Sequence, residues 1–560
     1  SAPIDLLVHH ADAAKLEKRV LQLAPEAASK AVAVGSHREA VSHLETALKY
    51  VKSAEVAEAA QLWEDWARTA CVSTRMSEDV IAGRARAAEL WGNLQRPDKV
   101  GENLRWQSRL HWYRGEAEQA EAIADEAIRI LESAADGFER AMAYSIRSQL
   151  FMLKLEMNDA IQWGERALLL AREGNNIEAE IHALNNIGSA MLFQNRNEGI
   201  TQLQKSLSLA IDHSFFPDAA RAYLNLAEHA VAFHKFELAE QIIEEGIKYC
   251  SDNDLEAWVY QLNGQRAEIF LDLGRLGDAA NVASSVLEYS QITPVMAMTP
   301  SLVLAKVAMR KGDASAGEQL DACYASAVSA ADINHAIKAS LALIEHAWLN
   351  GDHEAAKAQL SSLNKIARSK VHIFNEGERR VWSQYYNVGT SPLICESLLE
   401  VHRTELAGDF NAAASLHEMD GMTYNAALCL MRGADRCAHT FIPRAMNLLV
   451  PLETSATTKK SYAPAEELKV AMASPRTKRG PYKKARNHPL GLTAREAEIL
   501  SYIVQGDSNK EISLKLSRSP RTIGQHVSAI LKKLNAANRV EVILRVQNEP
   551  WIVSQIKDEC

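Results

Sequence analysis

A stretch near the C-terminus carries polar side chains at a spacing suited to reading DNA bases. Between Pro520 and about Leu534 the apolar residues recur at i, i+4, i+7, i+8 and i+11, which predicts a helix with one buried stripe. The opposite face offers Arg521, Gln525 and Ser528 in its N-terminal half. Because guanidinium, amide and hydroxyl groups hydrogen bond to base edges in the major groove, these three are the candidate base-reading residues. An ordinary solvent-exposed helix face is the alternative.

Cationic and hydroxyl side chains around this helix suit phosphate contacts instead. They are Thr522, Lys510, Lys532, Lys533 and Arg539. Between residues 475 and 545 there are fifteen Lys and Arg against five Asp and Glu, a balance of +10. Since the whole chain carries −9, the remainder carries −19. A basic tail on an acidic body predicts that the tail binds an anion such as double-stranded DNA.

Four helix starts would position these side chains. Thr493, Ser508 and Asn538 each stand three residues before a Glu, which is the spacing of a capping box. A fourth start, Ser519-Pro520, places a proline at the first helical position, where no amide hydrogen is missed. Residues 509–516 form a short amphipathic segment, and a three-residue turn separates it from the next helix. This arrangement predicts a helix-turn-helix.

The same residues follow the pattern of a known family. The matching segments are Leu492-Thr493-x-Arg495-Glu496-x-Glu498-Ile499-Leu500, Gly506-x-Ser508-Asn509-Lys510-Glu511-Ile512, Ser519-x-x-Thr522-Ile523-x-x-His526, Ile530-x-x-Lys533-Leu534 and Arg539-x-Glu541. Together they resemble the LuxR-type DNA-binding domain, which implies a small four-helix DNA reader over residues 490–560, acting on DNA as a homodimer. One departure is Gly524, because the family usually has a DNA-contacting lysine there. Either Arg521 and Gln525 take over the readout, or the helix adapts to a close backbone approach.

The segment before this domain is expected to be a linker. Residues 451–489 hold five prolines and runs of Ser and Thr, and they end in a basic stretch. The basic side chains could be solvated only, but their direct connection to a basic domain favours contact with DNA phosphates or a minor groove. The candidate linker contacts are Arg476, Lys478, Arg479, Lys483 and Lys484.

One motif recurs from the start of the chain to about residue 450: a polar or glycine turn, an acidic residue, a small residue and then an apolar helix. Gly115-Glu-Ala-Glu-Gln-Ala120 is an example. Aligned on the small residue, the copies fall at positions 40, 120, 160, 199, 239, 279, 317 and 356, and a degenerate copy is expected near Val80. A period of about 40 predicts stacked helical hairpins.

These units resemble tetratricopeptide repeats. The fold expected for the chain is therefore all-α: a tetratricopeptide-like superhelix over residues 1–450 with a concave binding surface, followed by the helix-turn-helix domain. A ninth copy of the motif ends at Ala413, 57 residues after the previous one, so an irregular segment is expected between about 368 and 400.

Tryptophans cluster in the first part of the array. Five of the ten lie between residues 63 and 112, and Trp63, Trp66, Trp106 and Trp112 are candidates for an aromatic-lined effector pocket. The alternative, which we favour, is packing between helices, because the neighbouring residues are apolar at helical spacing.

Motifs for catalysis are absent from the sequence. It has no phosphate-binding loop, dinucleotide-binding glycine motif, nucleophile elbow or zinc-protease motif, so the chain is not expected to be an enzyme. Carboxylates along the helices fall on polar faces, which predicts solvated surface. The seven widely spaced cysteines predict reduced thiols and no metal site. Without an apolar run near 18 residues or a signal peptide, a cytoplasmic protein with no membrane partner is expected.

The start of the chain carries a second resemblance. Asp5-Leu-Leu-Val-His-His10, Ala24-Pro-Glu-Ala-Ala-Ser-Lys-Ala31 and the first repeat motif are similar to the segment after the ATPase module in large ATP-binding LuxR-family regulators. In that family an ATPase precedes a helical-repeat sensor and a LuxR-type domain. Since no phosphate-binding loop is present, no cofactor is expected in this chain, and ATP only if an ATPase lies upstream in a longer protein.

The function expected from these patterns is a bacterial sequence-specific transcriptional regulator. The repeat array would sense a small-molecule or protein effector and control the DNA reader, with RNA polymerase as a further partner. The alternative is an interaction scaffold whose repeats capture a protein or peptide and whose C-terminal domain only localises it to DNA.

Overall fold

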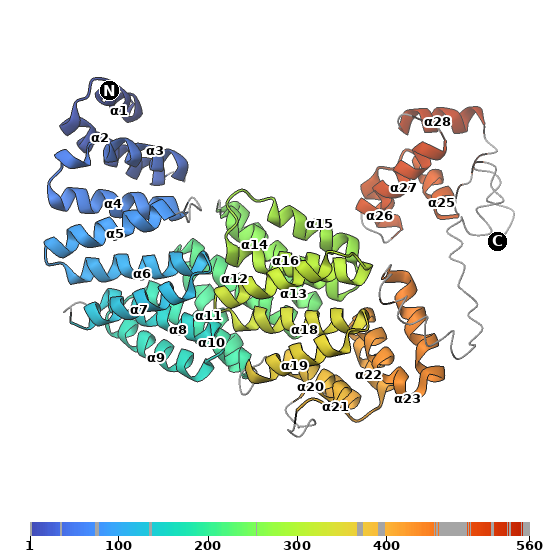
Figure 1. Cartoon of the computed structure of the whole chain (residues 1–560). Coiled ribbons are helices and arrows are strands. Elements are labelled where there is room, and N and C mark those ends of the chain that lie inside the picture. Colours follow the sequence, from blue (N-terminus) through green and yellow to red (C-terminus); the bar gives the residue numbers. More distant parts are fainter. Residues whose placement is uncertain are drawn as a thin grey trace. The chain divides into compact units, whose positions relative to one another are not determined.

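Helices account for the regular structure of the computed structural model, which has no β-strand among the residues that it describes (Figure 1). The described residues are 3–33, 36–72, 78–133, 137–253, 255–366, 373–389, 398–452, 454, 457, 490, 492, 494–516, 520–534, 536, 539–549 and 552. Within helices, the side chains of residues 37, 72, 435–439, 494, 520–522, 525 and 540 are left out of the description. The chain divides into two units, Ser1–Val470 and Ala471–Cys560.

The first unit is an array of antiparallel helices. Its N-terminal helices are α1 (Ile4–Ala13), α2 (Glu17–Ala33), α3 (His37–Leu48), α4 (Val56–Val72), α5 (Glu78–Asn93), α6 (Pro97–Tyr113), α7 (Ala117–Glu132), α8 (Phe138–Leu153), α9 (Met157–Glu173), α10 (Ile177–Phe193), α11 (Glu198–Asp212) and α12 (Phe216–Ala232). The array continues with α13 (Phe236–Asp252), α14 (Glu256–Asp272), α15 (Leu276–Leu287), α16 (Pro294–Lys311), α17 (Ala316–Ser329), α18 (Ile333–Leu349), α19 (His353–Ile366), α20 (Ile373–Tyr386), α21 (Glu400–Leu406), α22 (Phe410–Met419) and α23 (Thr423–Leu449). Two 3₁₀ turns, η1 (Val51–Ser53) and η2 (Val450–Leu452), complete it.

The predicted repeat period is confirmed. From α6 to α20 the first helix of each hairpin begins 38 to 41 residues after the previous one. These first helices also contact one another, α6 with α8, α8 with α10 and so on to α20, so they form the inner layer of the array. The helix α5 stands where the degenerate copy was expected, with Val80 buried.

The small residue of the motif lies where two helices of a hairpin cross. Ala120, Ala160 and Ala239 are fully buried near the start of the second helix. At the α10–α11 crossing both helices contribute a glycine, and a Cβ on Gly188 would lie 2.8 Å from the carbonyl oxygen of Gly199. The backbones can approach this closely only because neither residue has a side chain.

One position of the predicted alignment is wrong. Gly317 was assigned as the small crossing residue, but it is only half-buried, and Ala316 is the fully buried one. The buried alanine of this repeat follows the turn glycine Gly312 by four residues, whereas the spacing from Gly351 to Ala356 in the next repeat is five. The other glycines of the motif have a backbone role: Gly115 and Gly351 both have φ +76°, which an L-residue with a Cβ adopts at a cost.

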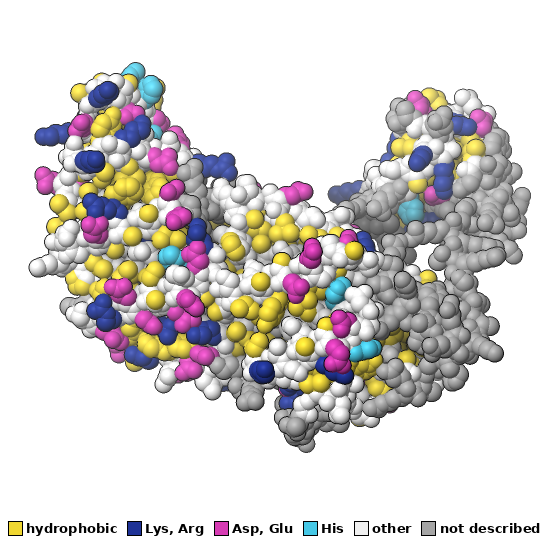
Figure 2. Space-filling model, viewed as in Figure 1, with side chains coloured by type: hydrophobic (Ala, Val, Ile, Leu, Met, Phe, Trp, Pro, Cys, Tyr) yellow, Lys and Arg dark blue, Asp and Glu magenta, His cyan; other side chains and the backbone are white. Residues whose placement is uncertain are grey.

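The array turns back on itself. The helix α6 contacts α16, and the Ser329 hydroxyl donates a hydrogen bond of 3.0 Å to the Gly115 carbonyl oxygen across 214 residues of sequence. The concave side of the inner helices is therefore partly enclosed. On the face seen in Figure 2, acidic and basic side chains are interspersed over the array.

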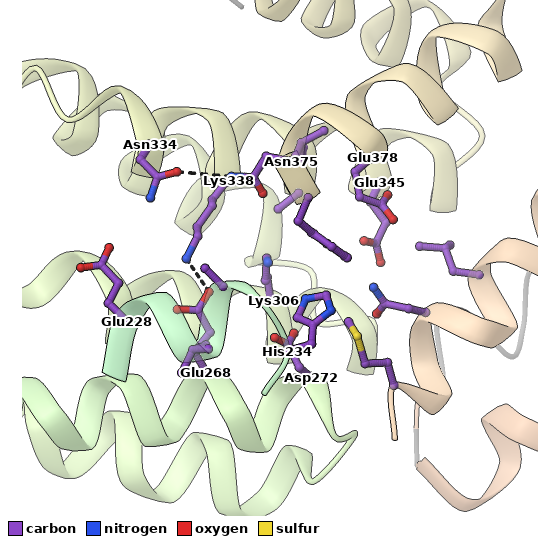
Figure 3. Close-up of a pocket in the computed structure, with 18 of the residues that line it drawn as sticks. Glu228, His234, Glu268, Asp272, Lys306, Asn334, Lys338, Glu345, Asn375 and Glu378 are labelled. Carbon is purple, nitrogen blue, oxygen red and sulfur yellow. Dashed lines mark hydrogen bonds and ion pairs between the residues drawn. The ribbon is translucent and has the colours of Figure 1, made fainter. Parts of the chain in front are cut away.

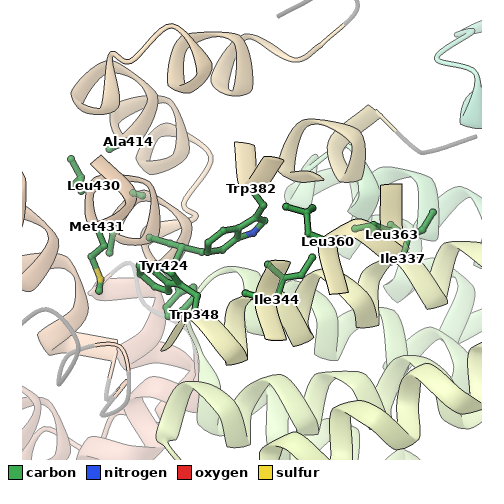
Figure 4. Close-up of a cluster of buried hydrophobic side chains, with 14 of the residues drawn as sticks. Ile337, Ile344, Trp348, Leu360, Leu363, Trp382, Ala414, Tyr424, Leu430 and Met431 are labelled. Atoms are coloured by element: carbon green, nitrogen blue, oxygen red, sulfur yellow. The ribbon is translucent and has the colours of Figure 1, made fainter. Parts of the chain in front are cut away.

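The C-terminal end of the array has a large hydrophobic core (Figure 4). Trp348 and Trp382 meet edge to face with ring centroids 5.6 Å apart, and fully buried Tyr424 packs in the same cluster. The Tyr424 hydroxyl lies 2.9 Å from the hydroxyl of Thr457, which is also fully buried. The packed array therefore reaches at least Thr457 and not residue 450 as expected, because this threonine satisfies a buried phenol.

The second unit contains α25 (Ala494–Val504), α26 (Asn509–Lys515), α27 (Pro520–Lys533) and α28 (Arg539–Asn548). Its core is formed by apolar side chains from all four helices, among them Ile499, Ile512, Ile523, Ile530 and Val542. The small four-helix domain predicted from the sequence is thus present.

Candidate functional site

The helix pair α26–α27 forms the predicted helix-turn-helix. The Ser508 hydroxyl accepts a hydrogen bond from the Glu511 amide at 3.3 Å, and the Glu511 carboxylate accepts one from the Ser508 amide at 2.7 Å. This capping box fixes the start of α26. Four residues separate α26 from α27, the longest of the four helices, whose stripe of Ile523, Val527 and Ile530 is buried in the domain core.

The exposed face of α27 carries the candidate base readers. Ser528 is exposed, and its hydroxyl donates to the Gly524 carbonyl oxygen at 3.1 Å. Arg521, Thr522 and Gln525 lie on the same helix, but their side chains fall outside the described part of the structure. Gly524 has open space around it: a Cβ there would come no nearer than 3.9 Å to Asn509. The missing lysine is therefore not explained by a close contact within the domain.

The candidate phosphate contacts divide into two kinds. Lys510 and Lys532 are exposed and have no hydrogen-bond or ion-pair partner among the described residues, so their ammonium groups are available to a ligand. Lys533 instead pairs with the buried carboxylate of Glu496 at 2.6 Å. Arg539 donates to Asn509 Oδ1 at 3.1 Å and also to the Asp507 carbonyl oxygen, which ties α28 to the start of α26.

Five further predicted contacts are in the basic linker. Arg476, Lys478, Arg479, Lys483 and Lys484 lie outside the described residues. They remain predictions.

Comparison with known proteins identifies the C-terminal unit. Residues 490–546 match the family model described as "Bacterial regulatory proteins, luxR family". This part of the chain is a LuxR-type DNA-binding domain. The matched residues begin just before α25, include α25, α26 and α27 in full, and end inside α28.

Individual relatives agree with this assignment. The transcriptional regulatory protein DesR of Bacillus subtilis (strain 168) is 40% identical over 60 residues, which is 11% of this chain and 30% of DesR. The HTH-type transcriptional regulator MalT of Vibrio campbellii (strain ATCC BAA-1116) is 23% identical over 388 residues, which is 63% of this chain and 43% of MalT. The chain thus spans less than half of the length of either regulator. A crystal structure of a Rap protein complexed with Competence and Sporulation Factor is similar over 68% of this chain and 98% of that chain, with 12% identity and a TM-score of 0.42.

The four tryptophans do not form one shared pocket, and Trp63 and Trp66 pack between helices, as the favoured interpretation predicts. Trp63 and Trp66 pack edge to face in the N-terminal core, where Trp66 is buried with Leu62 and Ala70. Trp106 lies among arginine side chains, with three guanidinium groups between 5.1 and 5.6 Å from its ring centroid. Trp112 alone of the four lines one of the cavities described below. Their sequence proximity reflects successive helices and not a shared surface.

The array instead holds two adjoining cavities along its inner helices. The first, which we call the aromatic cavity, has about 1060 Å³ of open space, and its aromatic lining is Trp112, Tyr113, Phe193 and Trp258. The second, which we call the acidic cavity, has about 970 Å³ and is shown in Figure 3. Its carboxylates are Glu228, Glu268, Asp272, Glu345 and Glu378. The two cavities share Phe193, Glu228, His229 and Asn334.

Charged groups in the acidic cavity are partly paired. Lys338 donates a hydrogen bond to the Glu268 carboxylate at 2.6 Å. Figure 3 shows this pair, and no interaction is drawn to Glu228. Burial, and then the Glu268 carboxylate, raise the pKa of Asp272 to about 6. These carboxylates were interpreted as solvated surface from the sequence, and that interpretation is wrong for them. In the sequence, a polar residue on the outer face of a superhelix has the same helical spacing as one on its inner face, so the pattern does not separate the two.

Among the described residues no helix combines the length and apolar character that crossing a membrane requires.

Proposed function

We propose that the chain is a sequence-specific DNA-binding transcriptional regulator, in which the repeat array binds an effector and controls the LuxR-type domain. The observation that carries the proposal is the exposed face of α27 beside two unpaired cations, Lys510 and Lys532, on a helix-turn-helix. Such a face suits the major groove, and the cations suit phosphates. The names of DesR and MalT as transcriptional regulators support the same class.

The effector site in this proposal is the pair of cavities inside the array. They lie on the inner helices, which are the usual binding side of a helical-repeat protein. On DNA, two copies of the chain bind two half-sites, and RNA polymerase is the partner through which the bound regulator acts.

The test is selection of bound sequences from a randomised duplex library by the full chain. We expect a recurrent site arranged as two half-sites. Gln525→Ala should change the preferred bases, whereas Lys510→Ala should weaken binding to all sequences alike. Lys357→Ala removes a partly exposed lysine on α19 of the array that pairs with Glu354; it is the control and should leave both unchanged. Enrichment of no sequence by the wild-type chain would refute the proposal.

A further inference from the structure

A single helix places three different polar groups on the wall of the aromatic cavity. Arg221, Asn225 and Glu228 stand at i, i+4 and i+7 on α12, so they lie on one face, and all three line the cavity. At 1.5 Å of rise per residue the first and last are about 10 Å apart along the helix axis. The cavity wall therefore presents a cation, an amide and an anion in a row.

Neither end of this row has an ion-pair partner among the described residues, although Asp218 lies near Arg221 and Lys338 near Glu228. The Arg221 guanidinium donates to the neutral Asn186 amide oxygen, and its Nη1 has no hydrogen-bond partner. Among the described residues Arg221 has no carboxylate at ion-pair distance, and Glu228 has no hydrogen bond or ion pair. Burial and the nearby Arg109 guanidinium lower the pKa of Arg221 to about 10, which still leaves it charged at neutral pH.

Side-chain amides around the row have one atom in a hydrogen bond and a second atom without a partner among the described residues. The Asn225 side-chain nitrogen donates hydrogen bonds to Asn185 Oδ1 at 2.5 Å and to Ser189 Oγ at 3.2 Å, and its oxygen accepts none from the described residues. The Asn334 side-chain oxygen accepts a hydrogen bond from Asn375 at 3.3 Å, and its nitrogen donates none to a described residue (Figure 3). Gln265 also lines the cavity, is 7% exposed and has an unpartnered Oε1. Unpaired buried polar atoms are destabilising unless a ligand or water satisfies them.

The chemistry of these groups narrows the class of ligand. A neutral sugar satisfies neither charge, a dicarboxylate lacks a cation for Glu228, and a polyamine lacks an anion for Arg221. A single amino acid carries both charges but too close together to span about 10 Å. An extended peptide advances about 3.3–3.6 Å per residue, so about three residues bridge the two ends, and its backbone supplies donors and acceptors for the amides.

We propose that the aromatic cavity binds a short extended peptide of three or four residues, with its C-terminal carboxylate at Arg221 and its N-terminal ammonium at Glu228. This inference rests on the proposed function for its regulatory meaning, because it names the class of effector. The adjoining acidic cavity, entered past Glu228 and Asn334, gives a side chain at the N-terminal end room to extend.

The experiment uses the full chain and a mixed library of tripeptides and tetrapeptides with free termini. Peptides retained with the protein after gel filtration are identified by mass spectrometry, and their Kd values are measured by calorimetry. Spermidine, glutarate and a neutral trisaccharide are offered in parallel. We expect retention of peptides only, and we expect N-acetylation or C-amidation of a retained peptide to raise its Kd about tenfold, the loss of one charge-assisted hydrogen bond.

Variants link these effects to the two charges. Glu228→Gln should raise the Kd of the free peptide about tenfold, and N-acetylation should then have no further effect. Glu237→Gln, an exposed glutamate on α13, is the matched control and should behave as wild type. Because Arg221 also holds Asn186, its replacement could unfold the array, so the C-amidated peptide tests that end without a mutation.

Three outcomes overturn the inference: no peptide is retained, one of the other three compounds is retained instead, or N-acetylation has the same effect in wild type and Glu228→Gln. DNA binding of the same protein without peptide is measured separately. Loss of DNA binding with peptide retained refutes the proposed function alone, and DNA binding without peptide retention refutes this inference alone.

Discussion

Lys533 near the end of α27 pairs with Glu496 in α25, with Nζ and Oε2 2.6 Å apart. The Glu496 side chain is only 7% exposed and that of Lys533 is 32% exposed. This ion pair therefore anchors the reading helix α27 to the domain core. Removing the lysine leaves a buried carboxylate without its cation. We expect Lys533→Met to lower the stability of the LuxR-type domain by about 1–2 kcal/mol, measured by urea denaturation.

Lys532→Met is the matched control, because the ammonium of Lys532 is exposed and has no partner among the described residues. It should weaken DNA binding with little change in stability. Equal stability of the two variants would show that the ion pair does not support the fold.

The α10–α11 crossing predicts a second result. Gly188→Ala places a methyl group against the Gly199 carbonyl oxygen, so the two backbones must move apart. Overpacking of this kind costs about 1–3 kcal/mol, and a lower Tm of the array in calorimetry would record it. Gly277→Ala on α15 is the control, since nothing lies within 4 Å of the added Cβ. It should be neutral or stabilise the array by up to about 1 kcal/mol.

These examples show which parts of the fold follow from sequence. The period could be predicted because each hairpin crossing needs a small residue, as at Ala160 and Ala239. The start of α26 could be predicted because its capping box has a local sequence pattern, whereas the predicted caps at Thr493, Ser519 and Asn538 lie outside the described residues. The return of the array on itself could not be predicted, since the Ser329–Gly115 contact joins residues 214 apart and no local pattern encodes it.

The site was predicted unevenly for the same reason. The Ile523 stripe fixes which face of α27 is exposed, so Ser528 could be placed from sequence. The Arg221–Asn225–Glu228 row was not predicted, because only the curvature of the array shows that this face of α12 lines a cavity. The partners of Lys533 and Arg539 depend on how separate helices pack, and spacing within one helix says nothing about that.

Asp272 in the acidic cavity predicts a pH dependence. Its pKa is raised to about 6, so the folded chain holds this proton more tightly than the unfolded chain, and the stabilisation is lost as pH rises through about 6. A neutral amide avoids the loss. We expect Asp272→Asn to be more stable than wild type at pH 7.5 by roughly 1–3 kcal/mol, with the difference shrinking toward zero near pH 4.

Thermal denaturation at both pH values measures this effect. Asp321→Asn, an exposed carboxyl on α17, is the control and should change stability little at either pH. A destabilised Asp272→Asn protein at pH 7.5 would mean that Lys306 and Arg310 stabilise the carboxylate more than burial disfavours it.

Gly524 predicts a gain of function. The open space around it accommodates a side chain, and α27 is more stable without a glycine by about 0.5–1 kcal/mol. Gly524→Lys should tighten DNA binding and add about one unit to its salt slope, whereas Gly524→Gln should stabilise the helix without changing the slope. Weaker binding by Gly524→Lys would indicate that a close backbone approach to DNA requires the glycine.

DNA binding as a function of salt tests the central claim most directly. Fluorescence anisotropy of a labelled duplex carrying the selected site is measured with the full chain over a range of salt concentrations. We expect log K to fall linearly with log salt, and Lys510→Ala to reduce the slope by about one unit while Lys357→Ala leaves it unchanged. Absence of duplex binding, or a slope that Lys510→Ala and Lys357→Ala change equally, would contradict a DNA reader at α26–α27.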